Sequence, residues 1–117
     1  MRRWRNGCWI RGGSALLVLL VGCGGGAPQL SEAAQRGKAT YLSVCIACHN
    51  QDPALDGAIG PAVAGAPREL LEARVLRAGY PVGYTPKRDS HAMPAFPQLA
   101  GQIDDLAAFL GECCRAR

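Results

Sequence analysis

The stretch Cys45-Ile46-Ala47-Cys48-His49 is a C-x-x-C-H motif near the middle of the 117-residue chain. Two thiols three positions apart near a helix end can reach the two vinyl groups of one porphyrin and form thioethers. The imidazole beside the second thiol then lies under the ring and can present a nitrogen to the iron. This pattern is typical of c-type haem attachment. We therefore expect one covalent haem c, held by Cys45 and Cys48, with His49 as an iron ligand.

Three other uses of the two cysteines fit this sequence less well. A thioredoxin-like redox pair needs no adjacent histidine and needs a β-α-β context. A zinc site needs a second pair of ligands, which only His91, Cys113 and Cys114 remain to supply. A structural disulfide between Cys45 and Cys48 is the simplest alternative.

The second iron ligand should be a methionine or a histidine. Met93 is the only methionine besides the initiator, and it lies in the segment His91-Ala-Met-Pro-Ala-Phe-Pro97. Thioether sulfur favours reduced iron, so Met/His ligation raises the reduction potential. Core packing is a weak explanation for a methionine in a proline-flanked loop, and His91 is the rival ligand. We expect Met93 to share the iron with His49.

The N-terminus has the features of a bacterial export signal. Four arginines precede a short apolar run at 15–21, and small residues follow it. The run is too short to span a bilayer, which needs about 20 apolar residues. Leu20-Val21-Gly22-Cys23 resembles the lipobox of bacterial lipoproteins, which implies cleavage before Cys23 and lipidation of its thiol. Ordinary cleavage nearby, with Cys23 unmodified, is the alternative.

The predicted leader also accounts for the basic charge of the chain. The full sequence has 13 Lys+Arg, 9 Asp+Glu and a formal net charge of +4. All the excess cations lie in residues 1–22, and the remainder carries nine basic and nine acidic side chains. An excess of basic residues would suggest nucleic acid as a partner. Because the excess lies in the leader alone, the domain itself gives no reason to expect nucleic-acid binding. We expect an exported protein, lipid-anchored to a bacterial membrane, with its domain on the periplasmic or extracytoplasmic side.

Beyond the leader the sequence predicts a tether and one small helical domain. The tether spans 23–30 and is rich in glycine, and the domain spans 31–117. Helical periodicity and end signals predict three helices, at 31–44, 68–78 and 102–113. The second helix should stop at Gly79. Two long loops rich in Gly and Pro, at 50–66 and 80–100, need something to pack against.

The chain resembles small class I c-type cytochromes over about 35–110. The resemblance rests on a glycine and an aromatic before the haem motif, a Gly-Pro after it, the methionine loop and the last helix. These features are Gly37, Tyr41, Cys45, Cys48, His49, Gly60-Pro61, Met93-Pro94-Ala95-Phe96 and Asp105-Leu-Ala-Ala-Phe109-Leu110. It implies an all-α cytochrome c fold, with three or four helices and long loops wrapped around the haem. It also implies that the Pro61 carbonyl accepts the imidazole N–H, and that Gly37 lets the first and last helices cross closely.

A six-coordinate iron has no free position for substrate, so we expect a one-electron carrier rather than an enzyme. Its partners would be proteins that donate and accept electrons, docking at an apolar rim formed by Pro61, Ala62, Pro94 and Ala95. Two alternatives stay open. One is a haem c subunit of a larger oxidoreductase or terminal oxidase. The other is a haem-based gas or redox sensor, in which Met93 leaves the iron.

Two segments have no clear function from the sequence. The segment Tyr80-Pro-Val-Gly-Tyr-Thr-Pro-Lys-Arg-Asp89 departs from the family pattern. Its Tyr84 or Lys87 could bond a haem propionate, but we expect a solvated loop. The adjacent Cys113 and Cys114 suit an intermolecular disulfide that makes a dimer, a strained bond between neighbours, or a frayed end with no role.

Overall fold

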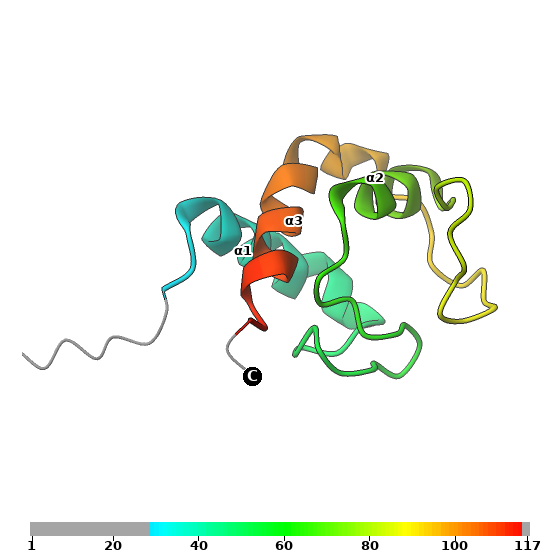
Figure 1. Cartoon of the computed structure of the whole chain (residues 1–117), viewed down its shortest axis with the longest axis horizontal. Helices are drawn as coiled ribbons and strands as arrows, with labels where there is room; N and C mark the ends of the chain where they lie inside the picture. Colours follow the sequence, from blue (N-terminus) through cyan, green and yellow to red (C-terminus); the bar gives the residue numbers. More distant parts are fainter. Residues whose placement is uncertain (1–28, 116–117) are drawn as a thin grey trace, which may run out of the picture.

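The computed structural model describes residues 29–115, so the leader, Cys23 and most of the tether lie outside the described part. Within that part the chain forms helices and loops and no strand, which confirms the all-α prediction. Three α-helices and two short 3-10 helices follow one another, as Figure 1 shows. They are α1 (Glu32–Val44), η1 (Cys45–Ala47), α2 (Arg68–Arg77), η2 (Pro97–Gln102) and α3 (Ile103–Glu112).

Helix α1 begins where its capping signals predict. The Ser31 hydroxyl accepts a hydrogen bond from the Ala34 N–H at 3.1 Å, which satisfies one of the free donors of the first turn. Glu32 adds negative charge at the positive end of the helix. The buried face then carries Ala34, Gly37 and Tyr41, and it faces α3.

The first and last helices cross at Gly37, as the sequence predicted (Figure 1). A Cβ atom built on Gly37 would lie 1.9 Å from the Asp105 carbonyl oxygen. Only a residue without a side chain therefore allows this approach. Next to the crossing, the Arg36 guanidinium makes two hydrogen bonds to the Asp105 carboxylate, at 2.8 and 2.9 Å. This ion pair holds the two helices in register from the outside.

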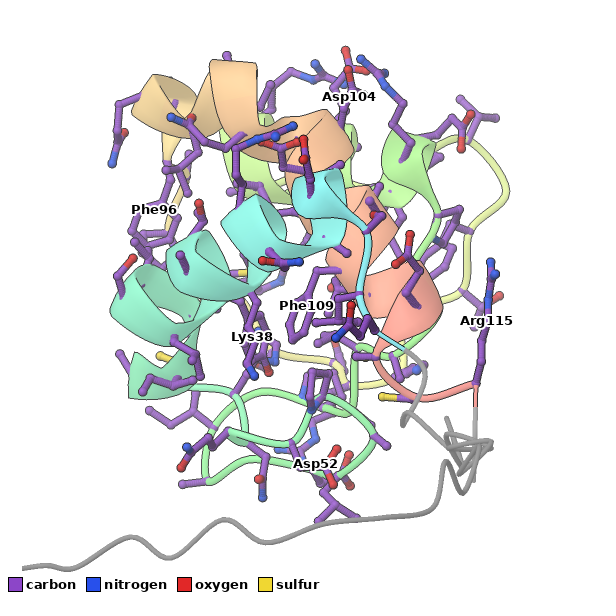
Figure 2. All side chains as sticks on the ribbon, turned by 90° about the vertical axis from the view of Figure 1, so that its left-hand side faces the viewer. Lys38, Asp52, Phe96, Asp104, Phe109 and Arg115 are labelled. Carbon is purple, nitrogen blue, oxygen red and sulfur yellow. The ribbon has the colours of Figure 1, made fainter. Side chains whose placement is uncertain are left out.

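The hydrophobic core lies between α1, α2 and α3. The rings of Tyr41 and Phe109 are 5.5 Å apart and tilted by 52°, a favourable aromatic geometry. Figure 2 shows Phe109 behind α1, in the interior of the domain. The other fully buried large side chains are Ile103 and Leu106 of α3. The apolar stripe of α3 thus supplies much of a core that remains small.

Helix α2 ends one residue earlier than predicted. Its last residue is Arg77, and Ala78 adopts the left-handed conformation with φ 52°. The Ala78 N–H donates to the Arg74 carbonyl, and the Gly79 N–H donates to the Ala73 carbonyl at 3.0 Å. Gly79, which we predicted as the stop, therefore follows the left-handed position rather than occupying it.

The second long loop is more ordered than its composition suggested. Its last part is the 3-10 helix η2, which leads directly into α3. Before it, the Phe96 N–H donates to the Val75 carbonyl at 2.6 Å, which fixes the loop against α2. Its first part, 80–90, leaves the end of α2 and extends away from it at one side of the domain (Figure 1). Both loops thus pack around the space between α1 and α2.

Candidate functional site

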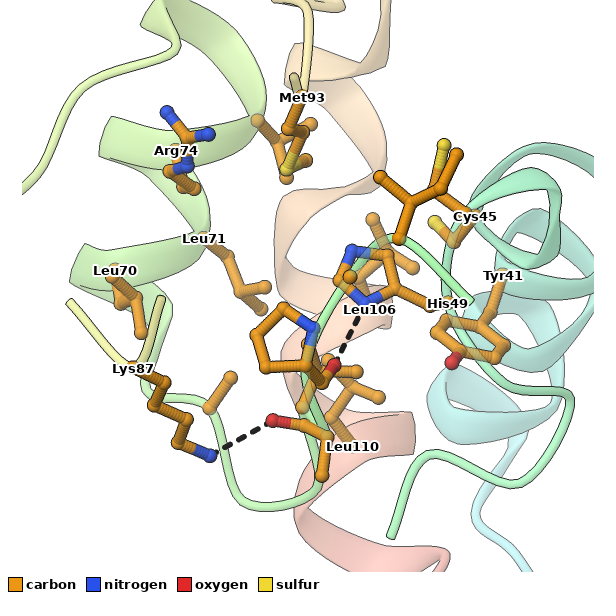
Figure 3. A pocket seen from close by; sticks show the side chains of 18 of the residues that line it. Tyr41, Cys45, His49, Leu70, Leu71, Arg74, Lys87, Met93, Leu106 and Leu110 are labelled. Carbon is orange, nitrogen blue, oxygen red and sulfur yellow. Dashed lines mark hydrogen bonds between the residues drawn. The ribbon is translucent and has the colours of Figure 1, made fainter. Parts of the chain in front are cut away.

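One largely apolar cavity of about 480 Å³ lies between the helices and the two long loops. The five residues predicted to bind the cofactor all line it, and Figure 3 shows the cavity from close by. They come from three separate segments of the chain and are Cys45, Cys48, His49, Pro61 and Met93. Lipidation of Cys23 was also predicted, and that residue lies outside the described part. The structure therefore assembles the haem motif and the methionine loop into one site.

The imidazole of His49 is held by the loop that follows it. Its Nδ1 atom lies 2.9 Å from the Pro61 carbonyl oxygen. Because a carbonyl oxygen can only accept, the ring donates its Nδ1–H in this contact, which leaves Nε2 as the nitrogen available to a metal. A hydrogen bond at the ring nitrogen that does not bind the metal fixes the ring and strengthens it as a ligand. The contact is the one that the family resemblance implied.

Two glycines let this loop lie directly against the motif. A Cβ on Gly60 would lie 2.5 to 2.9 Å from three atoms of the His49 ring, and a Cβ on Gly57 would lie 2.5 Å from the Cys48 carbonyl oxygen. The Gly60 N–H also donates to that carbonyl at 2.9 Å. The loop therefore forms a tight backbone cradle around His49. From the sequence, Gly60 was identified only as part of the family's Gly-Pro pair, and the role of Gly57 was not predicted.

The two cysteines lie at the end of α1 and in the turn after it. Both are half-buried thiols. Burial raises the pKa of the Cys45 thiol to about 11, because a thiolate is poorly solvated there. Cys45 is therefore a neutral thiol at ordinary pH, disfavoured as a nucleophile or a metal-binding thiolate.

Tyr41 connects the core to the residue after the histidine. Its hydroxyl donates to the Asn50 carbonyl oxygen at 2.6 Å, and its side chain is almost fully buried. Burial is the main reason why its pKa rises to about 12. The phenol therefore stays neutral and keeps its donor proton. One aromatic thus packs on α3 and also fixes the chain beside His49.

Met93 faces the same cavity from another wall. Its side chain is half-buried, packs on the hydrophobic core and points into the cavity (Figure 3). His91, the rival ligand in the sequence, is exposed and does not line the cavity. The geometry therefore favours Met93 over His91 as the partner of His49.

The segment at 80–89 was expected to be solvated, and most of its residues are exposed, but part of it also lines the cavity. Tyr80, Tyr84, Lys87 and Arg88 all contribute to the lining. The Lys87 ammonium donates to the Ala62 carbonyl at 2.8 Å. These contacts were missed because a loop without periodicity shows nothing of its tertiary neighbours. The one available signal was its two tyrosines and two cations in so short a stretch.

The zinc alternative finds no support in the described residues. No group of three or more His, Cys, Asp or Glu side chains that could hold a metal occurs in 29–115. Cys113 and Cys114 adjoin each other at the end of α3, and neither lines the cavity. Their sulfur atoms lie 2.6 Å apart, further than the roughly 2.05 Å of a disulfide. The predicted disulfide dimer stays a prediction.

A small all-α domain in which two thiols, an imidazole and a thioether converge on one apolar cavity has the architecture of a c-type cytochrome. The chain belongs to the family of cytochrome C oxidase, cbb3-type, subunit III, whose model matches residues 32–110. Comparison with curated proteins and with solved structures gave no match. The protein is therefore a class I c-type cytochrome domain that binds covalent haem c. It serves electron transfer, as a carrier or as an oxidase subunit.

The residues at the site fit this cofactor. The thiols of the C-x-x-C-H motif offer two thioether links. The hydrogen bond from Nδ1 to the Pro61 carbonyl leaves the other imidazole nitrogen of His49 available to the iron. The remaining lining is dominated by aliphatic side chains, among them Val44, Leu71, Val75, Leu106 and Leu110. Such a lining suits a flat apolar macrocycle and keeps water from its faces.

Proposed function

We propose that this protein is a membrane-tethered one-electron carrier whose haem iron is held by His49 and Met93. The observation that carries the proposal is that both side chains face one apolar cavity from different segments, each fixed by its own surroundings. The bound haem supplies an iron centre that accepts and releases one electron. The chain has no substrate chemistry of its own on this proposal.

The chain's part is to keep the site unchanged between the two oxidation states. The Pro61 carbonyl holds His49, and the packing of Met93 on the core holds the thioether. The apolar lining excludes water, whose reorganisation would slow electron transfer. Exposed apolar side chains beside the site suit brief docking of a partner. Ile59, which lines the cavity, is 48% exposed, and Ile46 in η1 is 41% exposed.

The tether is the second part of the proposal. A lipid on Cys23 would hold the protein at the outer side of a bacterial membrane, and 23–30 would link it to α1. A flexible chain of about eight residues reaches roughly 15 Å, so the domain can turn toward its partners without leaving the surface. No helix within 29–115 is both long and apolar enough to span a membrane.

Two measurements on the protein expressed with its full leader test the proposal. The ferric protein should show the weak long-wavelength band of Met-ligated haem, and Met93→Ala should lose it. His91→Ala is the matched control and should keep the band. The protein should also fractionate with membranes, and Cys23→Ala should release it to the soluble fraction. Carbon monoxide binding by the reduced parent would instead indicate an open iron position and a gas sensor.

The family match favours a second function. The family is described by a subunit of a terminal oxidase, so the domain could work while docked permanently to a larger complex. Purification from membranes in mild detergent separates the two. A carrier should elute alone, whereas a subunit should elute in a stable complex with other haem-containing chains.

A further inference from the structure

The charged side chains that line the cavity are all cations. They are Arg74, Lys87 and Arg88, and the lining contains no Asp or Glu. This bias does not reflect the domain as a whole, because 29–115 contains nine acidic and eight basic side chains. A cavity that otherwise suits an apolar molecule therefore has one basic side.

The basic side lies across the cavity from the cysteines. Arg74 comes from α2, and Lys87 and Arg88 come from the loop that follows it, whereas Cys45 and Cys48 lie at the end of α1. Figure 3 shows Arg74 and Lys87 on one side and Cys45 on the other. Haem c carries its two thioether links on one half of the ring and its two propionates on the other half. Attachment at the cysteines would therefore direct the propionates toward the cations.

Each cation is held in place by contacts that leave donors to spare. Lys87 donates to the Ala62 carbonyl at 2.8 Å, and Arg88 donates to the Ile59 carbonyl at 2.8 Å. An ammonium has three N–H donors and a guanidinium five, so further hydrogen bonds remain possible. The cations are thus positioned before any ligand arrives.

Arg74 is fixed in a similar way. Its guanidinium donates to the Ala78 carbonyl and lies 4.7 Å from the centre of the Tyr80 ring. Tyr80 in turn stacks on Tyr84, with ring centres 5.4 Å apart. The stack joins the end of α2 to the loop, so that Arg74 and Lys87 belong to one continuous surface.

The acidic residues of the domain do not neutralise this surface fully. Arg88 pairs with Asp56 at 3.3 Å. Within 29–115, neither Arg74 nor Lys87 has a carboxylate at ion-pairing distance, whereas Arg36, Arg68 and Arg77 each have at least one. Two cations on the cavity wall therefore lack a counter-ion of that kind. Such an arrangement favours an anionic ligand.

We propose that Arg74 and Lys87, supported by Arg88, form a carboxylate-binding site that receives the two haem propionates and keeps them ionised. This proposal rests on haem c in the cavity, and it holds for a carrier and for an oxidase subunit alike. The other titratable groups that line the cavity are Tyr41, Cys45, Cys48, His49, Tyr80 and Tyr84. None of them supplies a cation on the side of the cavity away from the motif.

The test is the midpoint potential of the haem-loaded protein as a function of pH. Oxidation adds positive charge at the iron, which favours loss of a proton from a nearby propionic acid. In a plot of midpoint potential against pH, the curve therefore bends downward near the pKa of a propionic acid group. Removing a neighbouring cation should move that bend upward by about one pH unit. Arg74→Gln and Lys87→Gln should both show this shift.

Matched controls separate this role from a structural one. Arg77→Gln removes the same charge three residues further along α2, and Lys38→Gln removes a lysine from α1; neither residue lines the cavity. Both controls should reproduce the parent curve. A merely structural role of Lys87, through Ala62, would displace the potential equally at every pH. Lys87→Arg, which keeps the charge, should leave the bend where it was.

The outcome that overturns the proposal is a bend at the same pH in the two lining variants and the two controls. Covalent haem content and the absorption spectrum show whether each variant has folded. If Arg74→Gln does not accumulate as folded protein, the pH dependence of the Lys87→Gln variant alone tests the proposal, because Lys87 is exposed. The carrier proposal fails on other evidence, namely loss of the methionine band or of membrane association.

Discussion

At the scale of single residues, His49 is the most tightly constrained side chain of the site. Its ring lies between the Pro61 carbonyl and the backbone of Gly60, with no space for one added methyl group. A residue that contributes no side chain therefore determines where an iron ligand lies. The position of the iron ligand His49 therefore depends directly on how Gly60 packs against it.

Gly60→Ala tests this constraint. The new Cβ would lie 2.5 Å from the nearest ring atom of His49, so the ring or the loop must move. We expect a loss of about 1–3 kcal/mol in stability and a lower yield of covalent haem, because the displaced imidazole binds iron less well. Thermal unfolding and a haem stain after denaturing electrophoresis measure the two effects.

Gly101→Ala is the matched control for this prediction. A Cβ at Gly101 meets no atom within 4 Å, and this glycine is not among those with positive φ. The control should therefore match the parent in haem yield. Equal haem yield and equal melting temperature for Gly60→Ala would show that the loop yields easily, contrary to this account.

Some residues of the site could be predicted from the sequence and others could not. Cys45, Cys48 and His49 are adjacent in the chain, so their chemistry was evident from spacing alone. Pro61 was found because the family resemblance supplied its position, and Met93 because it is the only methionine besides the initiator. Arg74 was missed because it lies on a helix whose exposed face also carries other charged residues, and only the folded loop shows which of them faces the cavity.

At the scale of elements, the crossing of α1 and α3 was predicted and is confirmed. The prediction used one glycine at the correct spacing from the motif. The 3-10 helix η2 was not predicted, because its sequence Pro-Gln-Leu-Ala-Gly-Gln has no helical periodicity. Its position depends on long-range contacts, such as the bond from the Phe96 N–H to Val75. An element that is stabilised by residues far away in the chain is difficult to predict from its local sequence.

Gly37→Val should destabilise the protein through this crossing. The added side chain would begin 1.9 Å from the Asp105 carbonyl oxygen, so the helices must separate. We expect a loss of about 3 kcal/mol, at the upper end of the usual range for overpacking. That corresponds to a fall of roughly 12–24 °C in melting temperature, measured by circular dichroism. A variant that melts within about 1 °C of the parent, well under 1 kcal/mol, would contradict the crossing.

Ala78→Gly should stabilise the end of α2. Ala78 has φ 52°, a conformation that costs an L-residue roughly 1–2 kcal/mol and glycine almost nothing. The greater freedom of glycine in the unfolded chain offsets part of this gain. The expected net gain is about 0.5–1 kcal/mol, measured by denaturant unfolding of the haem-loaded protein. Gly79→Ala serves for comparison, since Gly79 is not among the residues with positive φ, and it should give no such gain.

At the scale of the whole molecule, three carboxylates hold the fold together, and two of them join parts of the chain that are far apart in sequence. Glu112 accepts hydrogen bonds from the Ser31 N–H and hydroxyl, both at 2.9 Å, and so joins the two ends of the domain. Asp105 pairs with Arg36 across the helix crossing. Asp56 closes the loop around His49 by accepting from the Ala62 N–H at 2.7 Å. None of these contacts could be predicted from the sequence, because each depends on how segments of the chain meet in the folded domain.

These contacts predict how stability depends on pH. The Ser31 donors lower the pKa of Glu112 below its ordinary 4.5, Arg36 lowers that of Asp105 below its ordinary 3.8, and the Ala62 N–H and then Arg88 lower that of Asp56. A carboxyl group whose pKa is lower in the folded state binds protons more readily when unfolded. Its stabilisation is therefore complete above its ordinary pKa and is lost as the pH falls through the folded value.

The melting temperature of the haem-loaded protein should accordingly be constant near neutral pH and fall below about pH 4.5, where these groups begin to bind protons. Glu112→Gln and Asp105→Asn should lower the melting temperature at pH 7 and converge on the parent in acid, because protonation removes the same contacts from the parent. Glu69→Gln, at the start of α2, serves as the control and should stay parallel to the parent curve. Variants that remain equally far below the parent at every pH would show that these carboxylates act by packing rather than by charge.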